Sequence, residues 1–177
     1  MEKKNKKDIK RYKKIIIYGF MTAGKSSIGK LVAKRLLLPF YDTDVEFEKI
    51  YSDIGSFIKK NGMRRFRDIE KQIFLSLRSK KETSVIACGG GILPRGDRYN
   101  LEVFLNPCWE VIEKRLAKNT EKRPLLSDFP DSRDRIKKLY NKRLEGYMKA
   151  SLEIKETDMR KIVDKIIDIY EDQYKSQ

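Results

Sequence analysis

The sequence contains no histidine and only two cysteines among its 177 residues. Cys88 and Cys108 lack the spacing of zinc ligands, so a cysteine–histidine metal site and catalysis by histidine are excluded. Glycine and proline number only 10 and 5, which excludes a collagen-like or low-complexity chain. No apolar run approaches the roughly 18 residues of a membrane span. The basic, polar N-terminus is unlike a secretory signal, so we expect a cytoplasmic protein with no membrane partner.

What the sequence does have is charge, with 41 basic and 26 acidic residues and a net charge of +15. Residues 1–14 hold eight basic and two acidic side chains, a local net charge of +6. Tyr12 is the only aromatic residue there, and we interpret residues 1–13 as a disordered, solubilising extension rather than a nucleic-acid-binding arm. Residues 14–175 have the length of a single domain.

Apolar periodicity along residues 14–175 predicts strands that alternate with helices. The expected strands are residues 15–18, 40–41, 84–87, 102–105 and 152–154. The expected helices are residues 26–37, 45–51, 56–60, 65–80, 107–118, 131–148 and 159–174. This alternation favours an α/β fold, in which helices cover both faces of a parallel sheet, of the kind that binds nucleotides.

The segment from Gly19 to Ser26 matches the phosphate-binding pattern G-x-x-x-x-G-K-S/T. Its glycines let the backbone turn tightly enough to point successive N–H groups at phosphate oxygens. Lys25 is expected to reach the β- and γ-phosphates, and the hydroxyl of Ser26 to bind Mg²⁺. A strand precedes the segment and an amphipathic helix follows it, which is the context that the motif requires. The sequence therefore predicts nucleotide binding.

Asp42 and Asp44 follow the second predicted strand, where carboxyl ends of parallel strands line a ligand crevice. One aspartate is suited to hold Mg²⁺ through water, and the other to accept a proton from a hydroxyl group. The alternative is a helix start, because Thr43 and Glu46 have the spacing of a capping box.

Two further features are candidates for the acceptor side. Arg67 is predicted at the start of a helix, where a cation is unfavourable unless it serves a ligand or pairs with Asp68 or Glu70. Three glycines at residues 89–91 directly follow a strand, and they allow a ligand to approach the backbone closely, although a tight turn is the simpler alternative.

Two arginines complete the set. Arg123 lies in a polar loop and is suited to cover the phosphates, although an exposed loop arginine is the common alternative. Arg143 has Tyr140 and Tyr147 at neighbouring helical turns, so it is either an inward anion clamp or part of a solvated basic face.

Taken together and in this order, these motifs resemble the shikimate kinase family, whose members phosphorylate shikimate with ATP in aromatic amino-acid biosynthesis. The resemblance runs from about residue 14 to residue 169. It rests on the phosphate loop, D-S/T-D, F-R-x-x-E, G-G-G, R-P-L-L and an arginine four residues before a tyrosine. It implies a three-layer α/β/α domain with a five-stranded parallel sheet, a substrate-binding segment at about residues 44–75 and a lid at about residues 118–131.

The resemblance also implies roles for single residues. Lys25, Asp44 and Arg123 are implied to be catalytic, with Asp44 as the base for the 3-hydroxyl group. Mg²⁺ is implied on Ser26 and, through water, on Asp42. The residues implied to bind ATP are Thr22, Ala23, Gly24, Lys25, Ser26, Ser27, Arg115 and Arg123. Those implied to bind shikimate are Asp44, Arg67, Gly89, Gly90, Gly91 and Arg143.

Three positions depart from the family pattern. Thr22 replaces a common glycine and so requires either a negative φ or strain of about 1 kcal/mol. Glu145 replaces a common proline, which leaves the helix of Arg143 uninterrupted, and Ser27 replaces a common threonine. We expect a monomer that binds shikimate and ATP and no nucleic acid. The alternatives are a kinase for another small polyol acid such as gluconate, a nucleic-acid-binding module, and a protein that binds without catalysis.

Overall fold

The structure, a computed structural model, describes residues 12–118 and 132–175. Its strands are β1 (Lys14–Gly19), β2 (Phe40–Asp42), β3 (Ser84–Ala87), β4 (Leu101–Leu105) and β5 (Leu152–Ile154). Its helices are α1 (Lys25–Leu36), α2 (Thr43–Ile50), α3 (Ile54–Ser79), α4 (Trp109–Lys118), α6 (Ser132–Tyr147) and α7 (Met159–Lys175).

The five strands form one parallel sheet in the order β2-β3-β1-β4-β5, with β1 at its centre. Every residue of β1 is buried, because helices cover both faces of the sheet. Ile15 and Ile17 pack with α1 and α7 on one face, whereas Ile16 and Tyr18 pack with α3, α4 and α6 on the other. The predicted three-layer α/β/α fold with a five-stranded parallel sheet is confirmed.

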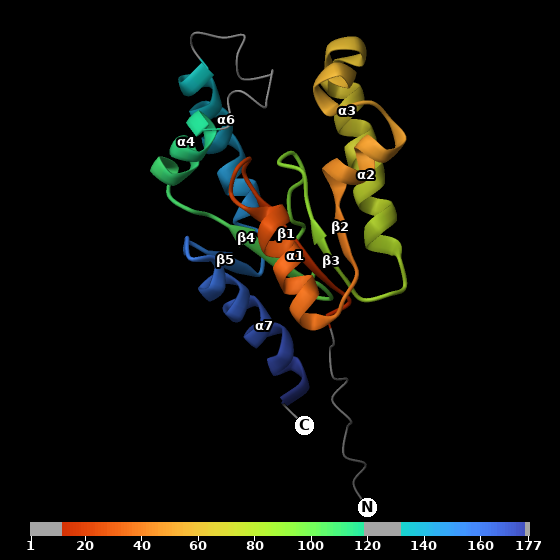
Figure 1. The fold of residues 1–177 in the computed structure, drawn as a ribbon, viewed down its shortest axis with the longest axis vertical. Coiled ribbons are helices and arrows are strands. Elements are labelled where there is room, and N and C mark those ends of the chain that lie inside the picture. Colours follow the sequence, from red (N-terminus) through yellow and green to blue (C-terminus); the bar gives the residue numbers. More distant parts are fainter. Residues whose placement is uncertain (1–11, 119–131, 176–177) are drawn as a thin grey trace, which may run out of the picture.

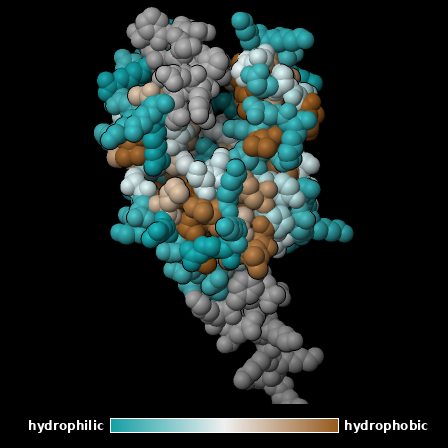
Figure 2. Space-filling model, in the orientation of Figure 1, coloured by the Kyte–Doolittle hydropathy of each residue, from teal (hydrophilic) through white to brown (hydrophobic). Residues whose placement is uncertain are grey.

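The helices beyond the carboxyl edge of the sheet form two arms, with α2 and α3 on one side and α4 and α6 on the other (Figure 1). Four aromatic and aliphatic side chains hold α2 and α3 together in a small core of their own: Phe47, Phe57, Phe66 and Ile69. The space-filling view shows the surface hollowed between the two arms (Figure 2). The strands β1, β2 and β3 therefore end at this hollow, and the segments that follow them start there.

The helix α3 agrees with the sequence-based expectation of two helices at residues 56–60 and 65–80, because it consists of two helical segments joined across a kink. It runs from Ile54 to Ser79 with an interruption at Gly62, whose φ of 82° lies outside the helical range. Glycine tolerates this positive φ without the steric cost that a side chain brings. Arg67 consequently lies near the start of the second helical segment of α3, just beyond the interruption, as the sequence predicts.

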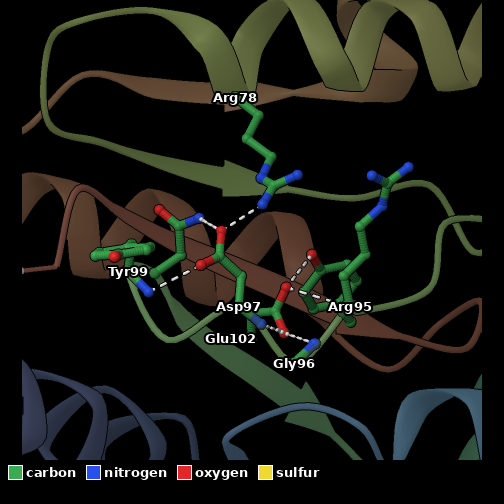
Figure 3. A network of polar contacts seen from close by, with 8 residues as sticks. Arg78, Arg95, Gly96, Asp97, Tyr99 and Glu102 are labelled. Carbon is green, nitrogen blue, oxygen red and sulfur yellow. Dashed lines mark hydrogen bonds and ion pairs between the residues drawn. The ribbon is translucent and has the colours of Figure 1, made fainter.

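A buried polar network anchors the loop between β3 and β4 at its far end (Figure 3). Glu102 is 1% exposed, and its carboxylate accepts hydrogen bonds from the backbone N–H groups of Arg95, Gly96 and Asp97 and from the hydroxyl of Tyr18. Asp97 also forms an ion pair with Arg78 of α3. The three glycines lie near the start of this loop, so the network holds the other end of the segment that carries them.

None of the helices within residues 12–118 and 132–175 is long and apolar enough to cross a membrane. The predicted extension at residues 1–13 and lid at residues 118–131, which includes Arg123, lie outside the described residues except at Tyr12, Lys13 and Lys118. The domain boundaries therefore stay predictions.

Candidate active site

The phosphate loop connects the end of β1 to the start of α1, at the carboxyl edge of the sheet. Gly24 precedes α1 with a φ of 100°, a conformation that L side chains rarely adopt. The first turn of α1 has no acidic residue, so its positive dipole end is available to an anion. Lys25 donates a hydrogen bond to the carbonyl of Phe20 at 2.9 Å, which folds its ammonium group back over the loop.

Thr22 adopts the left-handed conformation with a φ of 61°, so the loop accepts strain of about 1 kcal/mol. Contacts with α4 support this turn. Arg115 donates to the carbonyl oxygens of Thr22 and Ala23 at 3.1 and 3.3 Å, and the Thr22 hydroxyl lies 3.4 Å from the carbonyl of Ile112. The guanidinium of Arg115 therefore lies on the backbone of the phosphate loop.

Asp42 connects the phosphate loop to the start of α2. Its Oδ1 accepts hydrogen bonds from the backbone N–H groups of Asp44 and Val45, and its Oδ2 accepts one from the Ser26 hydroxyl at 2.5 Å. Asp42 is thus the cap of α2, and the predicted capping box is wrong because the helix starts one residue earlier than it requires. The hydroxyl of Thr43 instead accepts from the N–H of Gly89 at 2.7 Å.

The three glycines lie directly against charged side chains from α2 and α3. Arg67 and Glu70 form an ion pair at 2.7 Å, and Glu70 is 3% exposed. A Cβ atom on Gly89 would lie 2.1 Å from Oε1 of Glu70 and 2.6 Å from Oδ1 of Asp44. A Cβ atom on Gly91 would lie 2.3 Å from Nη1 of Arg67. Glycine at these two positions therefore gives the charged groups the space that they occupy.

Arg143 and Tyr147 reach the same glycine segment from α6. The Tyr147 hydroxyl donates to the Gly90 carbonyl at 2.5 Å, and Nη1 of Arg143 would lie 3.7 Å from a Cβ atom on Gly90. Burial raises the pKa of Tyr147 to about 12 and lowers the pKa of Arg143. The charge of Arg67 also lowers the pKa of Arg143, although less than burial does. Two arginines from different helices thus face one segment, an arrangement that suits an anion such as a carboxylate.

Comparisons with known proteins identify the family. A family model for shikimate kinase matches residues 21–171 of the chain. The shikimate kinase of Thermodesulfovibrio yellowstonii is 38% identical over 168 residues, which cover 90% of this chain and 95% of that protein. The chain belongs to the shikimate kinase family.

Two solved shikimate kinases have the same fold. The crystal structure of the Aquifex aeolicus enzyme is 32% identical with a TM-score of 0.72, and the match covers 87% of this chain and 94% of that one. The Acinetobacter baumannii enzyme, solved in complex with shikimate, is 26% identical with a TM-score of 0.78, and the match covers 91% and 94% of the two chains. The family resemblance read from the six sequence motifs is confirmed.

Among the residues that the shikimate kinase resemblance singled out, the structure separates two groups. The phosphate loop, Ser26, Asp42 and Arg115 lie together at the end of β1. The other group surrounds the glycine segment: Asp44, Arg67, Gly89, Gly90, Gly91 and Arg143. Arg123 lies outside the described residues. Two residues that contact the glycine segment, Glu70 and Tyr147, were given no site role from the sequence, although both belong to the quoted motifs.

Proposed function

We propose that this protein transfers the γ-phosphoryl group of ATP to the 3-hydroxyl group of shikimate, giving shikimate 3-phosphate and ADP. The observation that supports this most strongly is the placement of Arg67 and Arg143 against the glycine segment, next to the phosphate loop. Shikimate carries one carboxylate and three hydroxyl groups, and two guanidinium groups match the carboxylate.

On the nucleotide side, the proposed ATP ligands are the backbone and side chains of residues 22–27 with Lys25 on the terminal phosphates. Ser26 fits Mg²⁺ directly and Asp42 fits it through water, because a hydroxyl and a carboxylate are the hard oxygen donors it prefers. Within the described residues, no group of three or more acidic, cysteine or histidine side chains could hold a metal ion, so the phosphates of ATP would supply further ligands. Bound Mg²⁺ would offset charge on the phosphates. Arg115 of α4, whose guanidinium lies on the phosphate loop, is proposed to contact the adenine of ATP.

On the acceptor side, Asp44 is the proposed base. It lies at the start of α2, and its Oδ1 points to the glycine segment, as the close approach to a Cβ on Gly89 shows. Arg67 and Arg143 would hold the carboxylate of shikimate. Gly89 and Gly91 would leave room in the substrate site for the side chains of Glu70 and Arg67, and Gly90 would let the shikimate ring lie against the backbone. The oxygen of the 3-hydroxyl group forms the new P–O bond while the bond to ADP breaks, and Asp44 takes the proton.

The transfer depends mainly on positioning and electrostatics, because phosphoryl transfer needs no covalent intermediate on the protein. Lys25 is proposed to offset the charge that develops on the transferred group, together with Arg123 of the proposed lid. The proposal needs no second copy of the chain, since all the residues it uses come from one chain. It includes a monomeric, cytoplasmic enzyme.

The direct test is ADP release from Mg-ATP by the purified protein with and without shikimate. We expect release to depend on shikimate and to fall by at least about a hundredfold in Asp44→Asn, the scale of one general base. Asp53→Asn is the matched control, because Asp53 caps α3 through the Ser56 N–H group and asparagine caps equally well. ADP release that is the same with and without shikimate, but rises when another hydroxy acid is added, would refute the assignment of shikimate as the acceptor.

A further inference from the structure

The guanidinium group of Arg143 lies near two aromatic residues that come from different segments of the site. The ring of Phe20, the first residue after Gly19 in the phosphate loop, lies 5.9 Å from the guanidinium carbon. Tyr147 lies one turn further along the same helix and faces the same residue as Arg143: its hydroxyl donates to the Gly90 carbonyl, and Nη1 of Arg143 would lie 3.7 Å from a Cβ atom on Gly90. Phe20 and Tyr147 are 1% and 0% exposed, so neither ring has room to swing away.

The hydroxyl of Tyr147 is itself fixed in direction. It donates its proton to the Gly90 carbonyl at 2.5 Å, and its ring stacks on Phe104 of β4 at a centroid distance of 5.0 Å. A hydroxyl that donates its proton to one partner can still accept a hydrogen bond from a neighbouring donor through its lone pairs. Burial raises the pKa of Tyr147 to about 12, so the hydroxyl keeps this proton at neutral pH. Tyr147 thus offers Arg143 an acceptor in a set direction.

An acceptor of this kind matters because an arginine side chain has many rotamers, and ordering it in a binding site costs conformational entropy. An arginine that is already held in position before the ligand arrives loses less conformational entropy on binding. We propose that Tyr147 is a positioning residue that orients Arg143 toward the carboxylate of the acceptor, with the ring of Phe20 beside the guanidinium. The inference rests on the proposed function for the identity of that carboxylate. It makes Arg143 a direct link between the phosphate loop and the glycine segment.

The test is Tyr147→Phe, which removes one oxygen atom and keeps the ring that stacks on Phe104. We expect the KM for shikimate to rise about tenfold, the scale of one hydrogen bond to a charged group, with kcat and the KM for ATP within about twofold. Tyr140→Phe is the matched control. Tyr140 lies on the same helix, is nearly buried, and donates its hydroxyl to Asn106 rather than to the glycine segment. We expect Tyr140→Phe to leave the KM for shikimate within about twofold.

A double-mutant cycle separates aiming from general packing. In an Arg143→Lys background, Tyr147→Phe is expected to raise the KM for shikimate by less than about threefold, because the aimed group is gone. Equal effects of Tyr147→Phe with and without Arg143, or an equal rise in Tyr140→Phe, would overturn the proposal.

A measurement without turnover keeps this test apart from the test of the function. The Nε–H resonance of Arg143 in the ligand-free protein is assigned by its loss in Arg143→Lys. We expect Tyr147→Phe to shift and broaden it and Tyr140→Phe to leave it unchanged. An unchanged resonance in Tyr147→Phe would overturn the positioning role. A shifted resonance in a protein that does not consume shikimate would refute the proposed function and leave Tyr147 as the residue that positions Arg143.

Discussion

Alanine substitutions at the three consecutive glycines are expected to have different consequences. At Gly89, a Cβ atom would lie 2.1 Å from Oε1 of Glu70, and at Gly91 it would lie 2.3 Å from Nη1 of Arg67. At Gly90, the nearest atom would be the backbone nitrogen of Met21 at 3.5 Å, an ordinary van der Waals contact. None of the three glycines has a positive φ, so the distances alone decide the outcome.

The magnitude follows from what must move. Gly89→Ala and Gly91→Ala displace a member of the Arg67–Glu70 pair, in which the Glu70 side chain is 3% exposed. A buried polar group that loses its partner costs about 1–3 kcal/mol. Gly90→Ala displaces nothing and also restricts the unfolded chain, so its free energy of unfolding should stay within about 1 kcal/mol of the wild type.

Urea denaturation of the three variants measures these free energies, and initial rates give the KM for shikimate of each. We expect Gly89→Ala and Gly91→Ala to be less stable than Gly90→Ala and to bind shikimate more weakly than the wild type. Equal stability of all three variants, or Gly90→Ala as the least stable, would show that the charged side chains do not pack on the glycine segment as described.

Three further predictions concern residues that have no proposed role in the site. Leu37 ends α1 in the left-handed conformation and is 91% exposed, so Leu37→Asn should raise the free energy of unfolding by about 0.5–1 kcal/mol in urea denaturation. Burial alone would raise the pKa of Asp97, but hydrogen bonds from Tyr99 and Arg78 hold it below its usual value. The stabilising effect of the ionised Asp97 is therefore present at neutral pH and lost as the pH falls through the folded pKa. The free energy of unfolding that Asp97→Asn loses relative to the wild type should therefore shrink between about pH 7 and pH 3. A thiol reagent should label Cys108 alone in the native protein and Cys88 only after unfolding, because Cys88 is buried. Rapid labelling of two thiols in the native wild-type protein, or of the single thiol in native Cys108→Ser, would contradict this.

The fold was accessible from the sequence because its signals are local. The buried β1, the glycines of the phosphate loop and the amphipathic α1 are contiguous, and each reports the conformation of its own segment. The cap of α2 was misjudged because Asp42 and Thr43 are both good capping residues, and the choice depends on Gly89, which binds the Thr43 hydroxyl.

The contacts around the glycine segment were less accessible because they join parts of the chain that are distant in sequence. Glu70 has the same i, i+3 spacing from Arg67 as any surface ion pair, and only its burial against Gly89 distinguishes it. Tyr147 repeats with Tyr140 on one face of α6, which a core-packing stripe explains equally well. Its hydrogen bond to Gly90 joins residues 57 positions apart and depends on the packing of α6 against the sheet.

The central claim is that the phosphoryl group of ATP is transferred to the 3-oxygen of shikimate. Phosphorus NMR of the complete reaction tests it most directly, because it identifies the atom that receives the phosphoryl group. We predict one new phosphomonoester resonance, coupled to the proton on carbon 3 and growing in step with the β-phosphate signal of ADP. Growth of inorganic phosphate alone, or an ester on another oxygen of shikimate, would contradict the account.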